Sequence, residues 1–143
     1  FGIGYRFGKD FKSIQEIEPT ELKRILSLNI GGYDVFGGIV YERLITPFFS
    51  AEVGLGFAGA SLGSRFYFPS IRKNQVNFHL GQSTSWGINP SDGYTGTKTY
   101  IPFGINYFSN KNLMYSVDVG PQFWFDELDP TVISFSVRVG KVF

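Results

Sequence analysis

The stretch that most constrains the fold is the last eleven residues, 133–143, in which apolar side chains alternate with polar or small ones. Strict alternation over this length predicts a β-strand with one apolar and one polar face. Lys141 interrupts the apolar phase close to Phe143, where a long side chain can extend to a membrane interface. The apolar phase consists of Ile133, Phe135, Val137, Val139 and Phe143, and the other of Ser134, Ser136, Arg138 and Gly140.

Composition excludes several classes of protein. The chain has 13 Lys and Arg residues against 12 Asp and Glu residues, so no polyanionic partner such as a nucleic acid is expected. It has no cysteine, which excludes disulfides and thiolate metal sites. Mean hydropathy is −0.01 and no apolar run is long enough for a spanning helix. A transmembrane barrel has this composition, because half of each of its strands is polar.

Alternation recurs along the chain and predicts eight antiparallel strands in one domain, residues 1–143. The segment 26–32 is apolar on a different phase from the segment after it, so it is either a separate strand or an extension of one. Spanning strands of a tilted barrel need about 9–11 residues. The predicted strands cover residues 1–8, 35–45, 49–57, 62–68, 76–81, 100–107, 113–124 and 133–143.

The expected connections alternate in length. Long polar loops are predicted at residues 9–24, 83–98 and 126–130, and short turns at 46–47, 69–74 and 109–112. Only the connection at 58–61 is short where a long one is expected. An all-β transmembrane barrel with both termini in the periplasm places short turns on the periplasmic side and long loops outside. A secretory signal is expected to have been removed before residue 1.

This pattern resembles the small eight-stranded outer-membrane barrels of bacteria, the size class of OmpX and the OmpA transmembrane domain. Residues 36–68 also look like small outer-membrane barrels of Bacteroidota. The resemblance implies an integral outer-membrane location, contact with outer-membrane lipid or lipopolysaccharide, and recognition by the barrel-insertion machinery. It also implies that the closing strand carries the insertion signal, on Phe135, Val137, Val139 and Phe143.

The inner phase of the predicted strands collects three positive and three negative side chains. Buried charges require partners, so an ion-pair network is expected to fill and order the lumen. An eight-stranded barrel is just wide enough for its own side chains, and we therefore expect it not to conduct. The alternative is a path for protons or solutes. The six residues are Arg6, Glu42, Glu52, Arg65, Asp118 and Arg138.

No catalytic residue, cofactor or metal site is predicted. His79 is the only histidine, and one histidine without cysteine is a poor metal site. Lipid A deacylases of this size class carry a His-x-Ser-Asn motif on a strand, whereas here Leu80-Gly81-Gln82-Ser83 follows His79. We interpret His79 as a hydrogen-bonding side chain in the lumen. Trp86 and Tyr94 fall in the predicted loop 83–98, where exposed aromatic residues are candidates for recognition.

The primary hypothesis is a non-enzymatic outer-membrane barrel with a structural or accessory role, for example as a subunit of a complex with other outer-membrane proteins. The first alternative is an outer-membrane enzyme that modifies lipid or lipopolysaccharide, with Ser83 and His79 as the only nucleophile and base close in sequence. The second is a soluble, lipocalin-like barrel, which would place the apolar phase inside.

Overall fold

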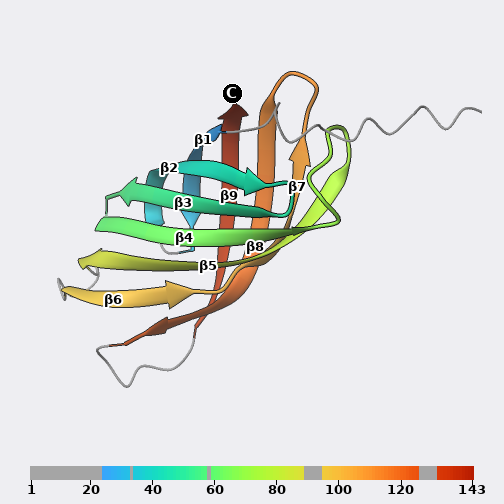
Figure 1. The fold of residues 1–143 in the computed structure, drawn as a ribbon. Helices are drawn as coiled ribbons and strands as arrows, with labels where there is room; N and C mark the ends of the chain where they lie inside the picture. Colours follow the sequence, from blue (N-terminus) through green and yellow to red (C-terminus); the bar gives the residue numbers. More distant parts are fainter. Residues whose placement is uncertain (1–23, 33, 58, 89–94, 126–131) are drawn as a thin grey trace, which may run out of the picture.

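A computed structural model describes residues 24–32, 34–57, 59–88, 95–125 and 132–143. This part of the chain is all β, and it contains no helix long and apolar enough to cross a membrane. The strands, coloured along the chain in Figure 1, are β1 (Arg24–Gly31), β2 (Asp34–Thr46), β3 (Phe49–Gly56), β4 (Gly59–Phe68), β5 (Val76–Ile88), β6 (Thr95–Tyr100), β7 (Phe103–Phe108), β8 (Leu113–Trp124) and β9 (Val132–Val142).

The strands close into an antiparallel barrel, because β1 pairs with β2 on one side and with β9 on the other. The barrel wall has eight strand positions, which we call staves. β6 and β7 together fill one of them, between β5 and β8, so the nine strands form eight staves. Pro102 interrupts this stave because it has no N–H for the ladder. The backbone N–H groups beside it remain paired: Gly81 donates to Pro102 O (2.8 Å) and Ile101 to Pro121 O (3.0 Å).

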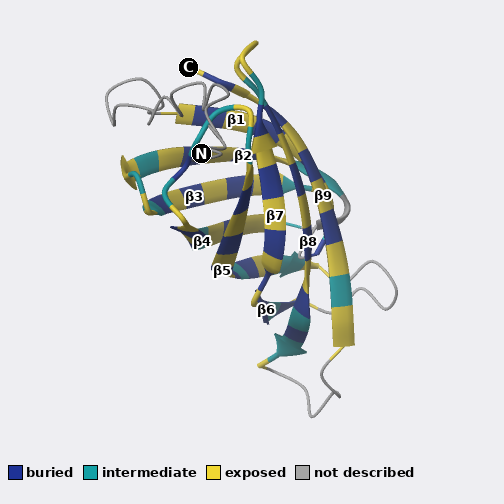
Figure 2. Ribbon diagram, turned by 90° about the vertical axis from the view of Figure 1, so that its right-hand side faces the viewer, coloured by how far each residue is buried: buried dark blue, intermediate teal, exposed yellow. Residues whose placement is uncertain are grey.

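Side chains alternate between the wall and the lumen along almost every strand, as the banding in Figure 2 shows. Large apolar residues face outward and stay exposed, whereas most buried side chains are polar or charged. In β9, Phe135, Val137 and Val139 face outward while Ser136 and Arg138 are buried. This polarity is the reverse of a soluble barrel, so the lipocalin-like alternative is wrong.

Eight staves are confirmed, but the first differs from the one expected. The predicted strand at residues 1–8 lies outside the described residues, and the first described stave is β1, with Leu28 opposite Val139 of β9. The segment 26–32 is therefore a separate strand up to Gly31. A tight turn to β2 follows, in which Gly31 and Gly32 have φ of 89° and 63°, values that favour glycine.

The predicted loop 83–98 is wrong, because strand structure occupies most of it. β5 continues to Ile88 and β6 begins at Thr95, with pairs such as Trp86 opposite Thr97. Outward positions here carry Gln82 and Thr84, so the apolar phase that marks the other strands is lost. The strand predicted to begin at Leu62 starts instead at Gly59, directly opposite Gly56.

The two ends of the barrel differ in their connections. One end, called the Phe143 end, holds Phe143 and the connections 47–48, 69–75 and 109–112. Hydrogen bonds hold this end together, for example from Val142 N–H to Asn112 O (2.8 Å). The opposite end, called the Phe57 end, holds the connections 32–33, 57–58, 89–94 and 125–131. The turns predicted at 46–47, 69–74 and 109–112 thus share one end, but the β1–β2 and β3–β4 connections at the other end are also short.

Candidate functional site in the lumen

A layer of buried ion pairs crosses the middle of the lumen. Glu52 of β3 lies between two guanidinium groups: Arg65 Nε is 3.2 Å from its Oε2, and Arg138 Nη1 is 2.7 Å from the same oxygen. Arg138 Nη2 also donates to Glu52 Oε1 at 3.1 Å, which makes the contact bidentate. All three side chains are almost completely buried, so each charge depends on the others for compensation.

Asp118 of β8 extends this layer to the other side of the barrel. Its Oδ2 lies 2.9 Å from Arg65 Nη2, and its Oδ1 lies 2.7 Å from His79 Nε2. His79 Nε2 thus lies between this carboxylate oxygen, which can only accept, and Arg65 Nη1, a donor 3.0 Å away. Ser116 Oγ donates to the same Oδ1 at 3.0 Å. Asp118 therefore has partners on both oxygens.

Neutral side chains complete the coordination of Arg138. Asn29 Oδ1, on β1, accepts from Arg138 Nε at 3.3 Å and from Ser136 Oγ at 2.6 Å. These bonds cross the seam between β1 and β9, where the barrel closes. The ionic layer thus joins side chains of β1, β3, β4, β5, β8 and β9.

A cluster of buried apolar side chains lies on the Phe143 side of this layer. Ile71, from the β4–β5 connection, packs into the end of the barrel, and Asn77 holds that connection by bonding to Arg72 N–H (3.0 Å), Arg72 O (3.1 Å) and Gln75 O (3.1 Å). The buried Glu42 contacts this cluster through Tyr67: its Oε1 accepts hydrogen bonds from Tyr67 Oη and from Ser50 Oγ (2.5 Å). The buried cluster consists of Ile25, Tyr67, Ile71, Phe108, Met114 and Val142.

Tyr100 lies across the lumen on the Phe57 side of the ionic layer. Its ring contacts Val40 of β2 across the barrel, and its hydroxyl donates to Ser134 O at 3.4 Å. Gly32 makes room for it, since a Cβ there would be 3.0 Å from Tyr100 Cε1. The lumen thus contains an apolar cluster, an ionic layer and a tyrosine crossbar in succession.

The structure brings most of the predicted lumen residues together. Glu52, Arg65, Asp118 and Arg138 form the ionic layer, whereas Glu42 makes hydrogen bonds beside it and Arg6 lies outside the described residues. Sequence reasoning missed Asn29, because it left the strand 26–32 unassigned. His79 lies in the lumen as its phase indicates, but its contact with Asp118 depends on register, which no local pattern supplies.

The prediction that Trp86 lies in a loop is wrong. Trp86 is on β5, where it faces outward and is 47% exposed. Tyr94 lies outside the described residues. The four residues of the predicted insertion signal, Phe135, Val137, Val139 and Phe143, are all exposed on the outer wall. Their role in insertion stays a prediction.

Ser83 and His79 do not form a nucleophile–base pair. His79 Nε2 is directed at Asp118, while His79 Nδ1 and Ser83 Oγ have no hydrogen-bond partner among the described residues. Nor does any group of three or more His, Cys, Asp or Glu side chains in the described part of the chain have the arrangement of a metal site.

Comparison with known proteins supplies one structural match. No family model and no curated protein matches the sequence. The N-terminal β-barrel domain of Pseudomonas aeruginosa OprF superposes with a TM-score of 0.58 at 14% identity, over 86% of this chain and 99% of that domain. The fold is that of an outer-membrane barrel domain. The resemblances to the OmpX size class and to Bacteroidota barrels stay predictions.

Proposed function

We propose that this chain is a non-enzymatic integral barrel of the bacterial outer membrane, with a structural or accessory role and a lumen closed to ions. The observation that carries the proposal is the combination of an exposed apolar wall with a charged, internally paired interior. An apolar wall needs lipid around it, because a soluble protein rarely exposes so large a continuous apolar surface. The similarity to the OprF barrel domain supports the same location.

We propose the orientation from the connections. The Phe143 end carries 47–48, 69–75 and 109–112, which match the three turns predicted to be short, whereas the Phe57 end carries 89–94 and 125–131 as well as the short connections 32–33 and 57–58. Because outer-membrane barrels have short turns in the periplasm, we place the Phe143 end there. Its partners are then outer-membrane lipid, the insertion machinery during biogenesis, and other outer-membrane proteins if it acts as a subunit.

Conductance tests the closed lumen. Purified barrel folded into planar lipid bilayers is expected to give no steady ionic current, while a channel-forming peptide in the same bilayers shows that the recording detects pores. Insertion is verified separately by protection from added protease. A steady current through inserted wild-type barrel would contradict the proposed closure.

Native extraction tests the accessory role. Outer membranes dissolved in mild detergent are expected to release the chain in a complex larger than a monomer, whose other subunits can be identified by mass spectrometry. A lone barrel of monomer mass would contradict the subunit role and leave a self-contained structural barrel. No observation in the described residues favours the lipid-modifying enzyme.

A further inference from the structure

Three cations lie together on the outer wall near the Phe143 end. Arg24 of β1 is directly opposite Arg43 of β2, and Lys141 of β9 is directly opposite Leu26, two residues along β1 from Arg24. All three side chains are exposed on the face that carries the apolar wall. Like charges directly opposite on neighbouring strands repel each other, so this arrangement is unfavourable unless an anion joins it.

No Asp or Glu side chain in the described part of the chain lies on the outer wall with these cations. The acidic side chains that the structure describes, Glu42, Glu52 and Asp118, all face the lumen. Neither Arg24 nor Arg43 makes an ion pair within that part of the chain. The Lys141 ammonium lies 5.7 Å from the centre of the Phe143 ring, an interaction that leaves its charge uncompensated.

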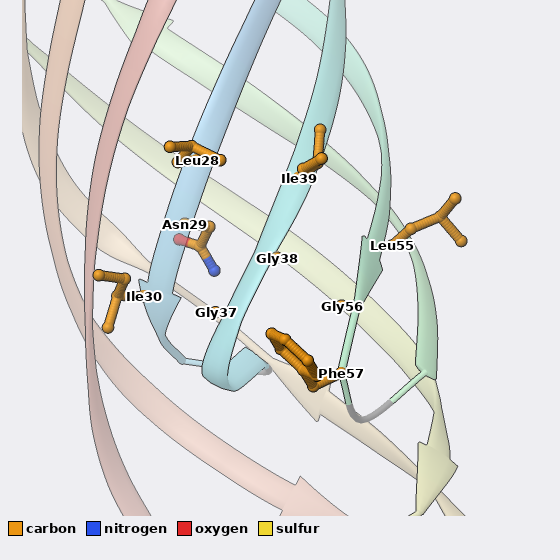
Figure 3. A pocket seen from close by; sticks show the side chains of 9 residues that line it. All are labelled: Leu28, Asn29, Ile30, Gly37, Gly38, Ile39, Leu55, Gly56 and Phe57. Carbon is orange, nitrogen blue, oxygen red and sulfur yellow. The ribbon is translucent and has the colours of Figure 1, made fainter.

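An apolar groove of about 510 Å³ begins farther up the same wall. Leu28 and Ile30 of β1 form one side and Leu55 and Phe57 the other, and the glycines of β2 leave the space between them unfilled (Figure 3). Leu28 is four residues from Arg24 along β1, a separation of about 13 Å at ~3.3 Å per residue. The exposed Leu26 lies between, so the apolar surface runs continuously from the cations to the groove.

We propose that this wall binds one anionic glycerophospholipid, with its phosphate on Arg24, Arg43 and Lys141 and an acyl chain along β1 in the groove. Charge complementarity selects the headgroup, and the spacing of cations and groove along one strand selects a molecule with an anionic head and a long tail. The inference rests on the placement in a membrane proposed above. In the proposed orientation this lipid belongs to the periplasmic leaflet.

The test titrates the folded full chain, in mild detergent, with dioleoylphosphatidylglycerol or dioleoylphosphatidylcholine, and native mass spectrometry counts bound lipid. Wild type is expected to prefer phosphatidylglycerol. At about fivefold in affinity per surface charge, the double variant Arg24→Gln/Arg43→Gln should bind it ~25-fold more weakly. The matched control Lys111→Gln removes an exposed charge from the β7–β8 turn, which adjoins Lys141 on the side away from Arg24 and Arg43, and should change binding less than twofold.

A second pair of variants tests the acyl chain. Ile39→Trp places an indole in the groove and is expected to weaken phosphatidylglycerol binding by about threefold or more, because the buried length of the chain falls. Val76→Trp adds the same ring to the outer wall of β5, outside the groove, and should leave binding unchanged. Equal binding by Ile39→Trp and Val76→Trp would overturn the placement of the chain.

The remaining outcomes separate the inference from the proposed function. Undiminished binding by the double variant, equal binding of both lipids, or an equal loss in Lys111→Gln would overturn the headgroup site. Insertion of each variant into phosphatidylcholine vesicles, measured by protease protection, shows whether the barrel still folds in lipid. Failure of wild type to insert would overturn the membrane function, whereas insertion without lipid selectivity would overturn only this inference.

Discussion

Glu52 is the residue on which the interior depends most, because it compensates two buried arginines. In Glu52→Gln, Arg138 and Arg65 lose the carboxylate that both of them contact, while Arg65 keeps Asp118. Removing one member of a buried ion pair lowers the free energy of unfolding by about 3–5 kcal/mol. Urea titration of vesicle-inserted barrel, followed by tryptophan fluorescence, measures this change.

The control for Glu52→Gln is Arg43→Gln, which removes an exposed charge with no ion-pair partner among the described residues. Its free energy of unfolding is expected to stay within about 0.5 kcal/mol of wild type. A loss below about 1 kcal/mol in Glu52→Gln would show that the ionic layer does not stabilise the barrel.

Alanine substitutions at Gly59 and Gly37 distinguish backbone strain from steric overlap of the added Cβ. Both have positive φ, 144° and 103°, so alanine strains the backbone at either position. At Gly59, however, a Cβ would be 1.9 Å from Trp86 O, whereas at Gly37 the nearest atom is 3.5 Å away. Gly37→Ala is expected to lower the free energy of unfolding by about 1 kcal/mol from strain alone, and Gly59→Ala by clearly more. Equal losses in urea titration would contradict the close approach of β4 and β5.

At the scale of elements, the β4–β5 connection places Ile71 in the apolar cluster at the Phe143 end. Ile71 is 4% exposed within the apolar cluster, so Ile71→Ala is expected to lower the free energy of unfolding by about 2–4 kcal/mol. Val76→Ala, on the exposed outer wall of the next strand, is the matched control in the same titration, performed in detergent and in vesicles. Equal effects of the two substitutions would show that Ile71 does not contribute to the core.

Strand phase is readable from the sequence wherever the outer face is uniformly apolar. In β3, β8 and β9 the alternation assigns each side chain to wall or lumen, and it correctly places Glu52, Asp118 and Arg138 inside. The same reasoning fails in the second half of β5, where Gln82 and Thr84 face outward and remove the contrast between the two phases.

The partners within the lumen could not be read in the same way. Arg138 and Glu52 are 86 residues apart and lie on strands that are not neighbours in the sheet. Their meeting depends on the stagger of all eight staves, because each register shift moves a side chain along the barrel axis. Local alternation gives the face of a residue but contains no information on this stagger.

For the whole molecule, the two tryptophans report on which surface meets lipid. Trp86 faces outward, whereas Trp124 lies 5.5 Å from the ammonium group of the buried Lys98. In vesicles with brominated acyl chains, Trp124→Phe, which retains Trp86, is expected to lose at least about half of its fluorescence. Trp86→Phe, which retains Trp124, should be quenched less. Stronger quenching of Trp124 would invert the wall and lumen assigned to β5 and β8.

The seam between β1 and β9 also has a consequence for the time course of folding. The hydrogen bond from Ser136 to Asn29 joins residues 107 positions apart, so the contact that closes the cylinder has nearly the largest loop-closure entropy available in the described chain. High contact order makes folding slow. Until that contact forms, the edges of β1 and β9 have unpaired N–H and C=O groups. The hydrocarbon of a bilayer offers these groups no hydrogen-bond partners. For the membrane placement proposed above, barrel closure and entry into lipid are therefore expected to proceed together at the end of folding.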